Sequence, residues 1–157
     1  MCAVLALCAL TNRGWAATVS ELRCEFRHDP VGLDVEKPRL SWVFNSERRS
    51  ERQTAYQVLA ASSPKRLAKN QGDLWDSGKV LSENQVQAEY AGRQLASHQS
   101  CYWRVRAWDA KGKPSPWSAT AAFTMGLLQP TDWQAQWISD PVLADPANRP
   151  LLEVTYY

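Results

Sequence analysis

The chain is built largely from short stretches in which apolar and polar residues alternate. The clearest of them covers residues 100–108. In it, Trp103, Val105 and Ala107 fall on one side, and charged or aromatic residues fall on the other. Side chains of a β-strand point to opposite faces with a period of two residues. This stretch therefore predicts a strand with an apolar inner row.

Six further stretches show a similar alternation between turn residues. They are residues 18–25, 39–45, 54–62, 74–80, 84–90 and 117–125. The last follows a turn that contains Gly and Pro, so it predicts a hairpin with the strand at 100–108. A short helix is predicted over 63–70, because Pro64 suits the first helical position and Gly72 ends the run.

Seven short strands within residues 18–126 predict an all-β fold, a sandwich of immunoglobulin-like or fibronectin type III topology. Two sheets that are each apolar on one face bury these faces against one another. The pattern changes after Gly126: residues 127–150 are rich in Pro, and 151–157 form an apolar stretch without a partner strand. Proteins avoid such unpaired edges, so 127–157 are expected to be a linker and the truncated start of a second β domain.

The first 17 residues resemble a signal peptide. An apolar run from Cys2 to Leu10 is followed by small residues at Ala16 and Ala17, although the usual basic start is missing. The run is too short to span a bilayer. We therefore expect export to the periplasm or the extracellular space, and no membrane span.

Cys24 and Cys101 are the two cysteines that remain after removal of such a segment. An oxidising compartment would permit a disulfide between them. The alternative is that each is a small buried apolar group. The sequence leaves both possibilities open.

The charge pattern argues against a polyanionic partner. The net charge is only +2, and the one basic cluster, residues 47–52, carries two Glu among its three Arg. Such a cluster is typical of a solvated loop. We therefore expect no nucleic-acid partner.

The sequence offers no catalytic constellation and no metal or cofactor motif. His28 and His98 stand alone without a second ligand at metal spacing, and the glycines are spread singly. The acidic residues Asp73, Asp76 and Asp109 lie beside predicted turns, where turn chemistry alone accounts for them. We expect no catalytic residue, metal or cofactor.

The outward face of the strand at 100–108 is the candidate contact surface. Tyr102, Arg104, Arg106 and Trp108 share this face. Three interpretations remain open: a cross-strand ladder of Arg on aromatic rings, packing against a neighbouring domain, or contact with a sugar ring.

Several longer segments resemble a known family. The hairpin YWRVRAWDAKGKPSPWS is similar to the last two strands of fibronectin type III domains. Further blocks are LRCEFRHDPVGLDVEKPRLSWVF, RQTAYQVLAAS, GDLWDSGKV and, after FTMGLL, DWQAQWI. Together these blocks, from Leu22 to Ile138, resemble the N-terminal region of bacterial α-L-rhamnosidases of glycoside hydrolase family 78.

The resemblance implies a division of labour. In that family a fibronectin type III-like module precedes a jelly-roll-like domain, which opens with a DW-x-A-x-WI segment, and an (α/α)₆ barrel performs the chemistry. A pair of Glu in the barrel inverts the anomeric centre, and no position here matches them. The resemblance thus implies a scaffold, inactive alone, whose partners are the missing domains. Rhamnose-containing glycans are reached through the intact enzyme, which removes terminal α-L-rhamnose without a cofactor.

Two other functions stay open, a free-standing carbohydrate-binding module and a protein-interaction module, because a fold does not fix a function. One departure from the family concerns Cys101, which stands where many relatives have a tyrosine. In immunoglobulin-like sandwiches such a corner tyrosine bonds back to the backbone. Either Tyr102 supplies this bond here, or the bond is absent.

Overall fold

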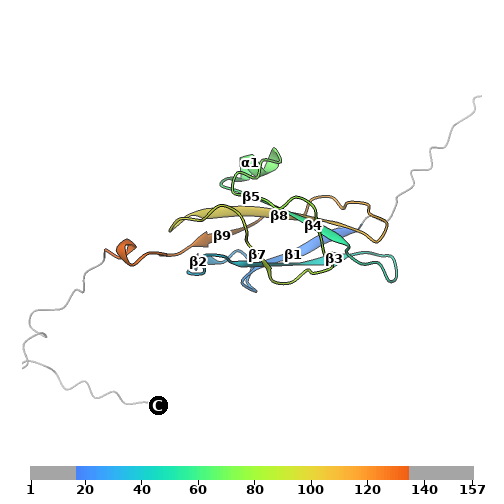
Figure 1. Ribbon diagram of the computed structural model, residues 1–157, viewed down its shortest axis with the longest axis horizontal. Coiled ribbons are helices and arrows are strands. Elements are labelled where there is room, and N and C mark those ends of the chain that lie inside the picture. The colour runs from blue at the N-terminus through green and yellow to red at the C-terminus, as the bar shows by residue number, and fades with distance from the viewer. Residues whose placement is uncertain (1–16, 135–157) are drawn as a thin grey trace, which may run out of the picture.

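The protein is a two-layer β-sandwich in a computed structural model that describes residues 17–134 (Figure 1). The smaller sheet, in the order β1-β3-β7, contains Thr18–Cys24, Arg39–Asn45 and Ala88–Glu89. The larger sheet, in the order β2-β9-β8-β4-β5, contains Val31–Leu33, Ala121–Met125, Ser100–Trp108, Ala55–Ala61 and Trp75–Asp76. A further short strand, β6 (Val80–Leu81), pairs with β4. The predicted all-β sandwich is confirmed.

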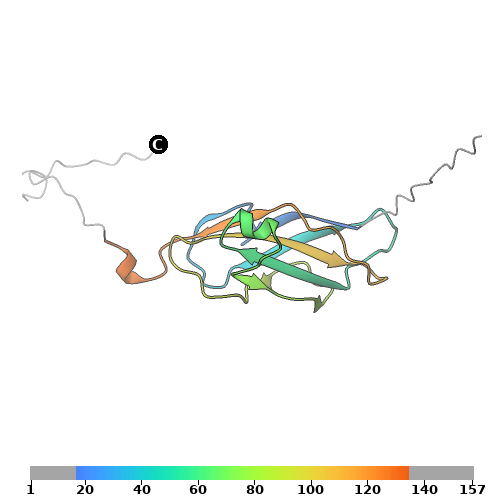
Figure 2. The same ribbon diagram turned by 90° about the horizontal axis from the view of Figure 1, so that it is seen from above.

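The long strand β8 lies at the centre of the larger sheet. It pairs antiparallel with β4 along nearly its whole length, from Tyr102 opposite Ala61 to Trp108 opposite Ala55. Its other edge pairs with β9 over its first four residues only. The described chain enters at one end of the sandwich, near β1, and leaves at the opposite end after β9 (Figures 1 and 2).

The strands differ from the prediction in four places. Residues 31–33 form β2, which pairs parallel with β9, although this Gly- and Pro-containing stretch predicts a loop. The predicted strand at 74–80 is split into β5 and β6, and the one at 84–90 is reduced to β7. The predicted strand at 117–125 begins only at Ala121, because the residues before it bond to β8 in an irregular manner.

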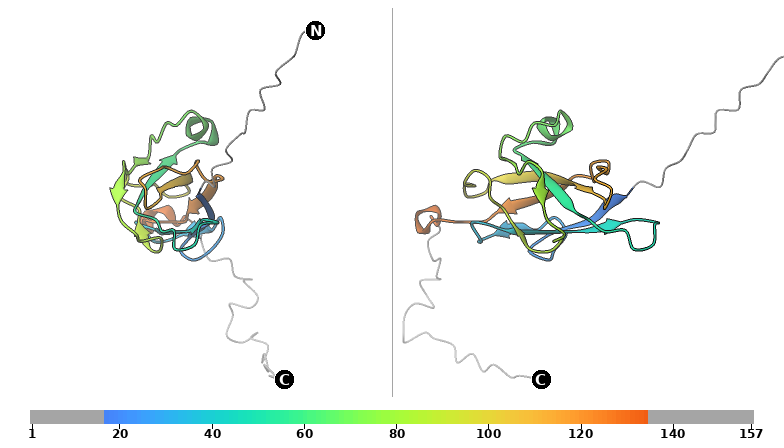
Figure 3. Two further views of the ribbon diagram at one scale, coloured as in Figure 1. Left: turned by 90° about the vertical axis from the view of Figure 1, so that its right-hand side faces the viewer. Right: turned by 45° about the vertical axis from the view of Figure 1, so that its right-hand side comes forward.

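The helix prediction is confirmed. Helix α1 (Pro64–Ala68) has Ser63 as its N-cap, with the side chain accepting a hydrogen bond from the Arg66 backbone N–H. Viewed along the long axis, α1 lies outside the larger sheet (Figure 3, left). Its buried Leu67 packs with Leu59 of β4, and Tyr102 and Trp117 complete this second small cluster.

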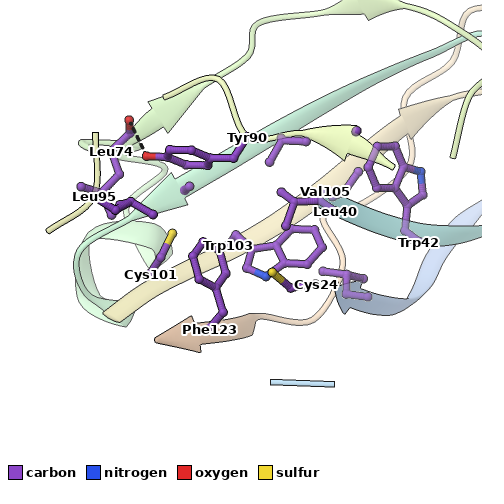
Figure 4. Close-up of a cluster of buried hydrophobic side chains, with 14 of the residues drawn as sticks. Cys24, Leu40, Trp42, Leu74, Tyr90, Leu95, Cys101, Trp103, Val105 and Phe123 are labelled. Carbon is purple, nitrogen blue, oxygen red and sulfur yellow. Dashed lines mark hydrogen bonds between the residues drawn. The ribbon is translucent and has the colours of Figure 1, made fainter. Parts of the chain in front are cut away.

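The main core lies between the two sheets. As predicted, Trp103, Val105 and Ala107 point inward, and each is completely buried. Leu40 of β3 and Phe123 of β9 pack in the same cluster (Figure 4). Burial of a side chain of the size of Val105, Leu40 or Phe123 contributes about 1.5–3 kcal/mol, so this cluster stabilises the contact between the sheets.

Both described cysteines are buried free thiols. Cys24 ends β1 in the smaller sheet, whereas Cys101 lies in β8 of the larger sheet. Burial raises the pKa of each to about 12, because a thiolate loses its hydration in the core. The sequence leaves open a disulfide or two separate buried thiols, and the structure shows the second alternative (Figure 4).

A different tyrosine, Tyr90, bonds through its hydroxyl to the backbone. The Tyr90 hydroxyl, just after β7, points at two backbone carbonyls, 2.9 Å from that of Arg93 and 3.3 Å from that of Leu74 (Figure 4). The chain passes so closely here that a Cβ on Gly92 would lie 2.6 Å from the Tyr90 hydroxyl. No hydrogen bond is found for the Tyr102 hydroxyl within the described residues, so of the two alternatives that the sequence suggested, the structure has the second, in which the bond at the start of β8 is absent.

Candidate functional site: the outer face of β8

The structure divides the four predicted contact residues between two surroundings. Tyr102 is half-buried beneath α1, where it packs in the small cluster with Leu67. Arg104 and Arg106 are half-buried on the open part of the same face, and Trp108 is only 8% exposed. The alternation of β8 is thus as predicted. Tyr102, however, is covered by the helix and does not share the open surface with the other three residues.

Two further residues, Lys79 and Trp117, complete this face. The Lys79 ammonium lies 4.9 Å from the centre of the Trp108 ring, and the Arg106 guanidinium lies 5.1 Å from it. Arg106 also lies 4.7 Å from the centre of the Trp117 ring, as does Arg104. Cations within about 6 Å of a ring centre are attracted by its π-electrons. We call these five residues the Arg–Trp ladder.

An irregular pairing beside β8 holds Trp117 in the ladder. Ser118 donates its backbone N–H to the Val105 carbonyl at 2.8 Å, and its hydroxyl accepts the Val105 N–H at 3.0 Å. Ser115 makes the same two bonds with Ala107, at 2.7 and 3.1 Å. The serine hydroxyls replace backbone carbonyls as acceptors, so this stretch runs beside β8 without the regular backbone hydrogen bonds of a β-sheet.

This arrangement explains why the alternation of the sequence did not place Trp117 on the outer face of β8. The two serines are three residues apart, whereas their partners in β8 are two apart, so the period-two rule fails between them. Pro116 fits there because it has no N–H to donate. The Ser-Pro-Trp-Ser segment was the sequence feature that could have indicated this irregular pairing. Lys79 carried no comparable signal, because it follows the turn at Gly78.

Polar side chains of β4, β5 and the α1–β5 loop surround the ladder. Arg106 donates from Nε to Gln57 at 2.9 Å, and Gln57 in turn donates to Asp76 at 2.5 Å. Arg104 donates from Nη2 to Asn70. A shallow pocket of about 230 Å³ opens here. Its lining is Gln57, Leu59, Asn70, Asp76, Arg106 and Trp117.

The ladder is rich in positive charge. Burial, and then the neighbouring charge of Arg106, lower the pKa of Arg104 below its usual value. Within residues 17–134, none of the ion pairs closer than 4.0 Å includes Arg104, Arg106 or Lys79. The cations of this face therefore contact ring faces and amide oxygens instead of carboxylates.

The three acidic residues beside predicted turns are all engaged in hydrogen bonds. The Asp109 carboxylate accepts the backbone N–H groups of Lys111 and Lys113 at 2.9 and 2.8 Å. Asp76 accepts that of Gly78 at 2.9 Å, and Asp73 bonds to Ser62. Each carboxylate is engaged locally, which is the role that turn chemistry predicts.

The two histidines lie apart on exposed loops. His28 is 3.6 Å from the Glu21 carboxylate, and His98 lies in the loop before β8. The described residues contain no group of three or more His, Cys, Asp or Glu that could hold a metal ion. In the same part of the chain, no helix is both long and apolar enough to cross a membrane.

A second feature ties the segment after β9 to the loop before β8. The Ser97 hydroxyl donates to the Asp132 carboxylate and accepts the Leu128 N–H at 3.0 Å. Asp132 also accepts the Gln129 N–H at 3.0 Å, closing the single 3₁₀ turn Pro130–Asp132. The bond from Ser97 is the main cause that lowers the pKa of Asp132. We call this pairing of Ser97 and Asp132 the exit contact.

Known proteins resemble this chain over most of its length. Residues 19–129 match the family described as "Rha78A-like, N-terminal immunoglobulin domain". An α-L-rhamnosidase of Streptomyces avermitilis is 44% identical over 126 residues, which are 80% of this chain but 12% of that protein. One from Formosa agariphila is 35% identical over 72% of this chain and 12% of the relative.

Solved structures give the same result. The α-L-rhamnosidase of Streptomyces avermitilis in complex with L-rhamnose has a TM-score of 0.76 at 43% identity, covering 81% of this chain and 12% of that one. The enzyme of Dictyoglumus thermophilum has a TM-score of 0.74 at 40% identity, covering 80% and 14%. This chain thus spans about an eighth of the length of these relatives, and it belongs to the family of Rha78A-like N-terminal immunoglobulin domains.

Proposed function

We propose that this chain is the non-catalytic N-terminal scaffold module of an α-L-rhamnosidase, an enzyme that removes terminal α-L-rhamnose from glycosides and polysaccharides. The family match over residues 19–129 supports this proposal most directly. The relatives devote about seven-eighths of their length to other parts, which leaves room for a separate catalytic domain.

The chemistry of the described residues agrees with a scaffold. Glycoside hydrolysis generally needs two carboxyl groups facing each other across the scissile bond. Here Asp76 and Asp109 are engaged in turns, Asp73 accepts hydrogen bonds from Ser62, and Glu25 is bound to Arg39 at 2.7 Å. Carboxylates that satisfy local partners in this way are poorly placed to donate a proton or to activate water.

The exit contact gives the scaffold a physical means of positioning. Asp132 is the first residue of the DW-x-A-x-WI segment, which in the resemblance opens the next domain. Its bond to Ser97 holds the departing chain against the sandwich instead of leaving it on a free linker. We therefore propose 18–126 as the module and 127–157 as a linker and the truncated start of a jelly-roll-like domain.

The test compares this chain with an intact relative. The purified chain, incubated with an aryl α-L-rhamnoside, is expected to show no turnover above buffer, whereas the intact Streptomyces avermitilis enzyme serves as the positive control. In that enzyme, deletion of the equivalent module is expected to lower the thermal midpoint of the remainder. Turnover by the isolated chain would contradict the proposal, as would a deletion without effect on stability.

We also propose that the chain is exported, as its first 17 residues suggest; residues 1–16 lie outside the described part. Expression in a bacterial host with fractionation of the periplasm, followed by N-terminal sequencing, tests this. Cleavage near Ala17 is expected, and a chain retained in the cytosol with an intact N-terminus would contradict it.

A further inference from the structure

The Arg–Trp ladder leaves three neighbouring positive charges without a carboxylate partner in the described chain. Some cations elsewhere on the sandwich lie beside a carboxylate, as Arg39 does beside Glu25 at 2.7 Å and Arg66 beside Asp73 at 3.7 Å. The nearest acidic side chain of the pocket, Asp76, bonds to Gln57 and to a turn instead. Like charges held close together repel, and an anion bound between them would relieve the repulsion.

The ladder also has hydrogen-bond donors to spare. A guanidinium carries five N–H groups. Arg106 uses only Nε within the described residues, so both Nη atoms remain for an outside acceptor. Arg104 uses Nη2, and its buried Nε has no partner there. Because both guanidiniums are already held 4.7 Å from the centre of the Trp117 ring, a carboxylate would bind them with little further loss of side-chain freedom.

The same stacking makes a sugar a poor occupant. A sugar ring binds an aromatic residue by lying on its face. Trp117 has two guanidiniums within 4.7 Å of its centre, and Trp108 has two cations within 5.1 Å. These cations already contact the rings on which a sugar would have to lie, so they compete with it for the ring faces. The pocket of about 230 Å³ is also below the 300–1,000 Å³ of common small-molecule sites.

We propose that the Arg–Trp ladder is a docking surface for an acidic protein surface. Arg104 and Arg106 are two residues apart in β8, about 6.8 Å along a strand. The fitting partner presents two Asp or Glu carboxylates at a similar distance, as residues two apart on a strand or four apart on a helix do. This proposal goes beyond the scaffold role and does not depend on which reaction the parent enzyme catalyses.

The test is a titration of the ¹⁵N-labelled chain with poly-L-glutamate, followed through the Arg Nε–H and backbone N–H resonances. Shifts are expected at Arg104, Arg106 and their neighbours, and they should vanish in about 0.5 M NaCl, where charges are screened. The double variant Arg104→Gln/Arg106→Gln should weaken binding by about tenfold or more. The matched control, Arg23→Gln/Arg48→Gln, changes the net charge equally at exposed arginines elsewhere.

Two further variants guard against a loss of folding. Arg104→Lys/Arg106→Lys keeps the charge but removes the planar fork, so binding should fall by a smaller factor. Lys79→Gln removes one charge without touching either arginine. The thermal midpoint of every variant is measured alongside, and a variant that does not fold is replaced by these two.

Each other result would overturn the proposal. Equal weakening in the Arg23/Arg48 control means that only net charge attracts the polymer. Shifts with polygalacturonate but not with poly-L-glutamate mean that the surface recognises an acidic carbohydrate. No shift at low salt with poly-L-glutamate in excess over the protein means that the ladder is closed upon itself.

Discussion

The two faces of β8 are held by different forces, although they alternate along one strand. The inner residues Trp103, Val105 and Ala107 are completely buried and owe their place to the exclusion of water. The outer residues Arg104 and Arg106 remain half-exposed and are held by ring faces and amide oxygens. Each cation–π contact of this kind is worth about 0.5–1 kcal/mol.

This difference separates what forms the fold from what is available for function. A change in the inner row alters the free energy of unfolding by several kcal/mol, because the core has no freedom to rearrange. A change in the outer row alters it little, so the composition of this face is free to follow a partner. The following experiments probe that separation, beginning with the largest expected effect.

Trp103→Ala is expected to lower the free energy of unfolding by about 3–5 kcal/mol, since it leaves a large cavity between the sheets. Denaturant unfolding measures this change. Trp133→Ala serves as the matched control, because its side chain is 65% exposed, and it should stay within about 0.5 kcal/mol of the parent chain. Similar losses in both variants would show that β8 has no privileged inner face.

The thiols of the core predict a loss of stability at alkaline pH. Burial raises the pKa of Cys24 and Cys101 to about 12, whereas an unfolded thiol ionises near pH 8.5. Between these values the unfolded chain releases protons that the folded chain retains. The free energy of unfolding should therefore fall as the pH rises, by up to about 1.4 kcal/mol per pH unit for each thiol.

Urea unfolding between about pH 7.5 and 9.5 measures this slope, in a background with Cys2→Ser and Cys8→Ser. The control replaces Cys24 and Cys101 by Ala, which should flatten the slope whatever it does to stability at neutral pH. An unchanged slope would mean that these thiols ionise in the folded chain as readily as in water.

Tyr90→Phe tests a polar group within the apolar core. The substitution removes the donor that points at the carbonyls of Arg93 and Leu74, and it should cost about 1–2 kcal/mol. The comparison is Tyr56→Phe, because no hydrogen bond is found for the Tyr56 hydroxyl within the described residues; it should change stability by less. If both variants lower the free energy of unfolding equally, the hydrogen bonds of the Tyr90 hydroxyl contribute nothing to stability.

Ser118→Ala tests the link between the two faces of β8. The Val105 N–H loses its side-chain acceptor, and the expected cost is about 1 kcal/mol. Because Ser118 also fixes Trp117, the Nε–H resonances of the stacked arginines should shift. Thr120→Ala, two residues further on, is the control and should do neither.

Arg106→Gln is expected to have the smallest effect, about 0.5–1 kcal/mol, because it removes one cation from between two rings. Thermal unfolding at low and high salt measures it. A loss as large as that of Trp103→Ala would contradict the separation of the two faces.

The inner row of β8 was predictable because strand periodicity is a local property of the sequence. The rest of this surface depended on contacts between distant segments. The period-two pattern placed Arg104 and Arg106 correctly but could not show that α1 would cover Tyr102. It also missed Trp117, whose segment pairs with β8 through serine hydroxyls.

Strand β2 failed prediction for a related reason. It has three residues, Val31–Leu33, with Gly32 in the middle at a positive φ of 77°, so nothing in its own sequence favours a strand. It forms only because β9, about 90 residues further on, offers a free edge to pair with. The hydroxyl of Tyr90 likewise found its partners through the approach of a distant loop.

The exit contact has a consequence for how this family can diverge. The direction in which the chain leaves the sandwich depends on Ser97, a residue of the loop before β8, and not only on the residues that follow β9. An insertion or deletion in that loop is therefore expected to change the direction in which the chain leaves the sandwich, although the residues after β9 stay the same. Relatives whose corresponding loops differ in length are expected to differ in this direction.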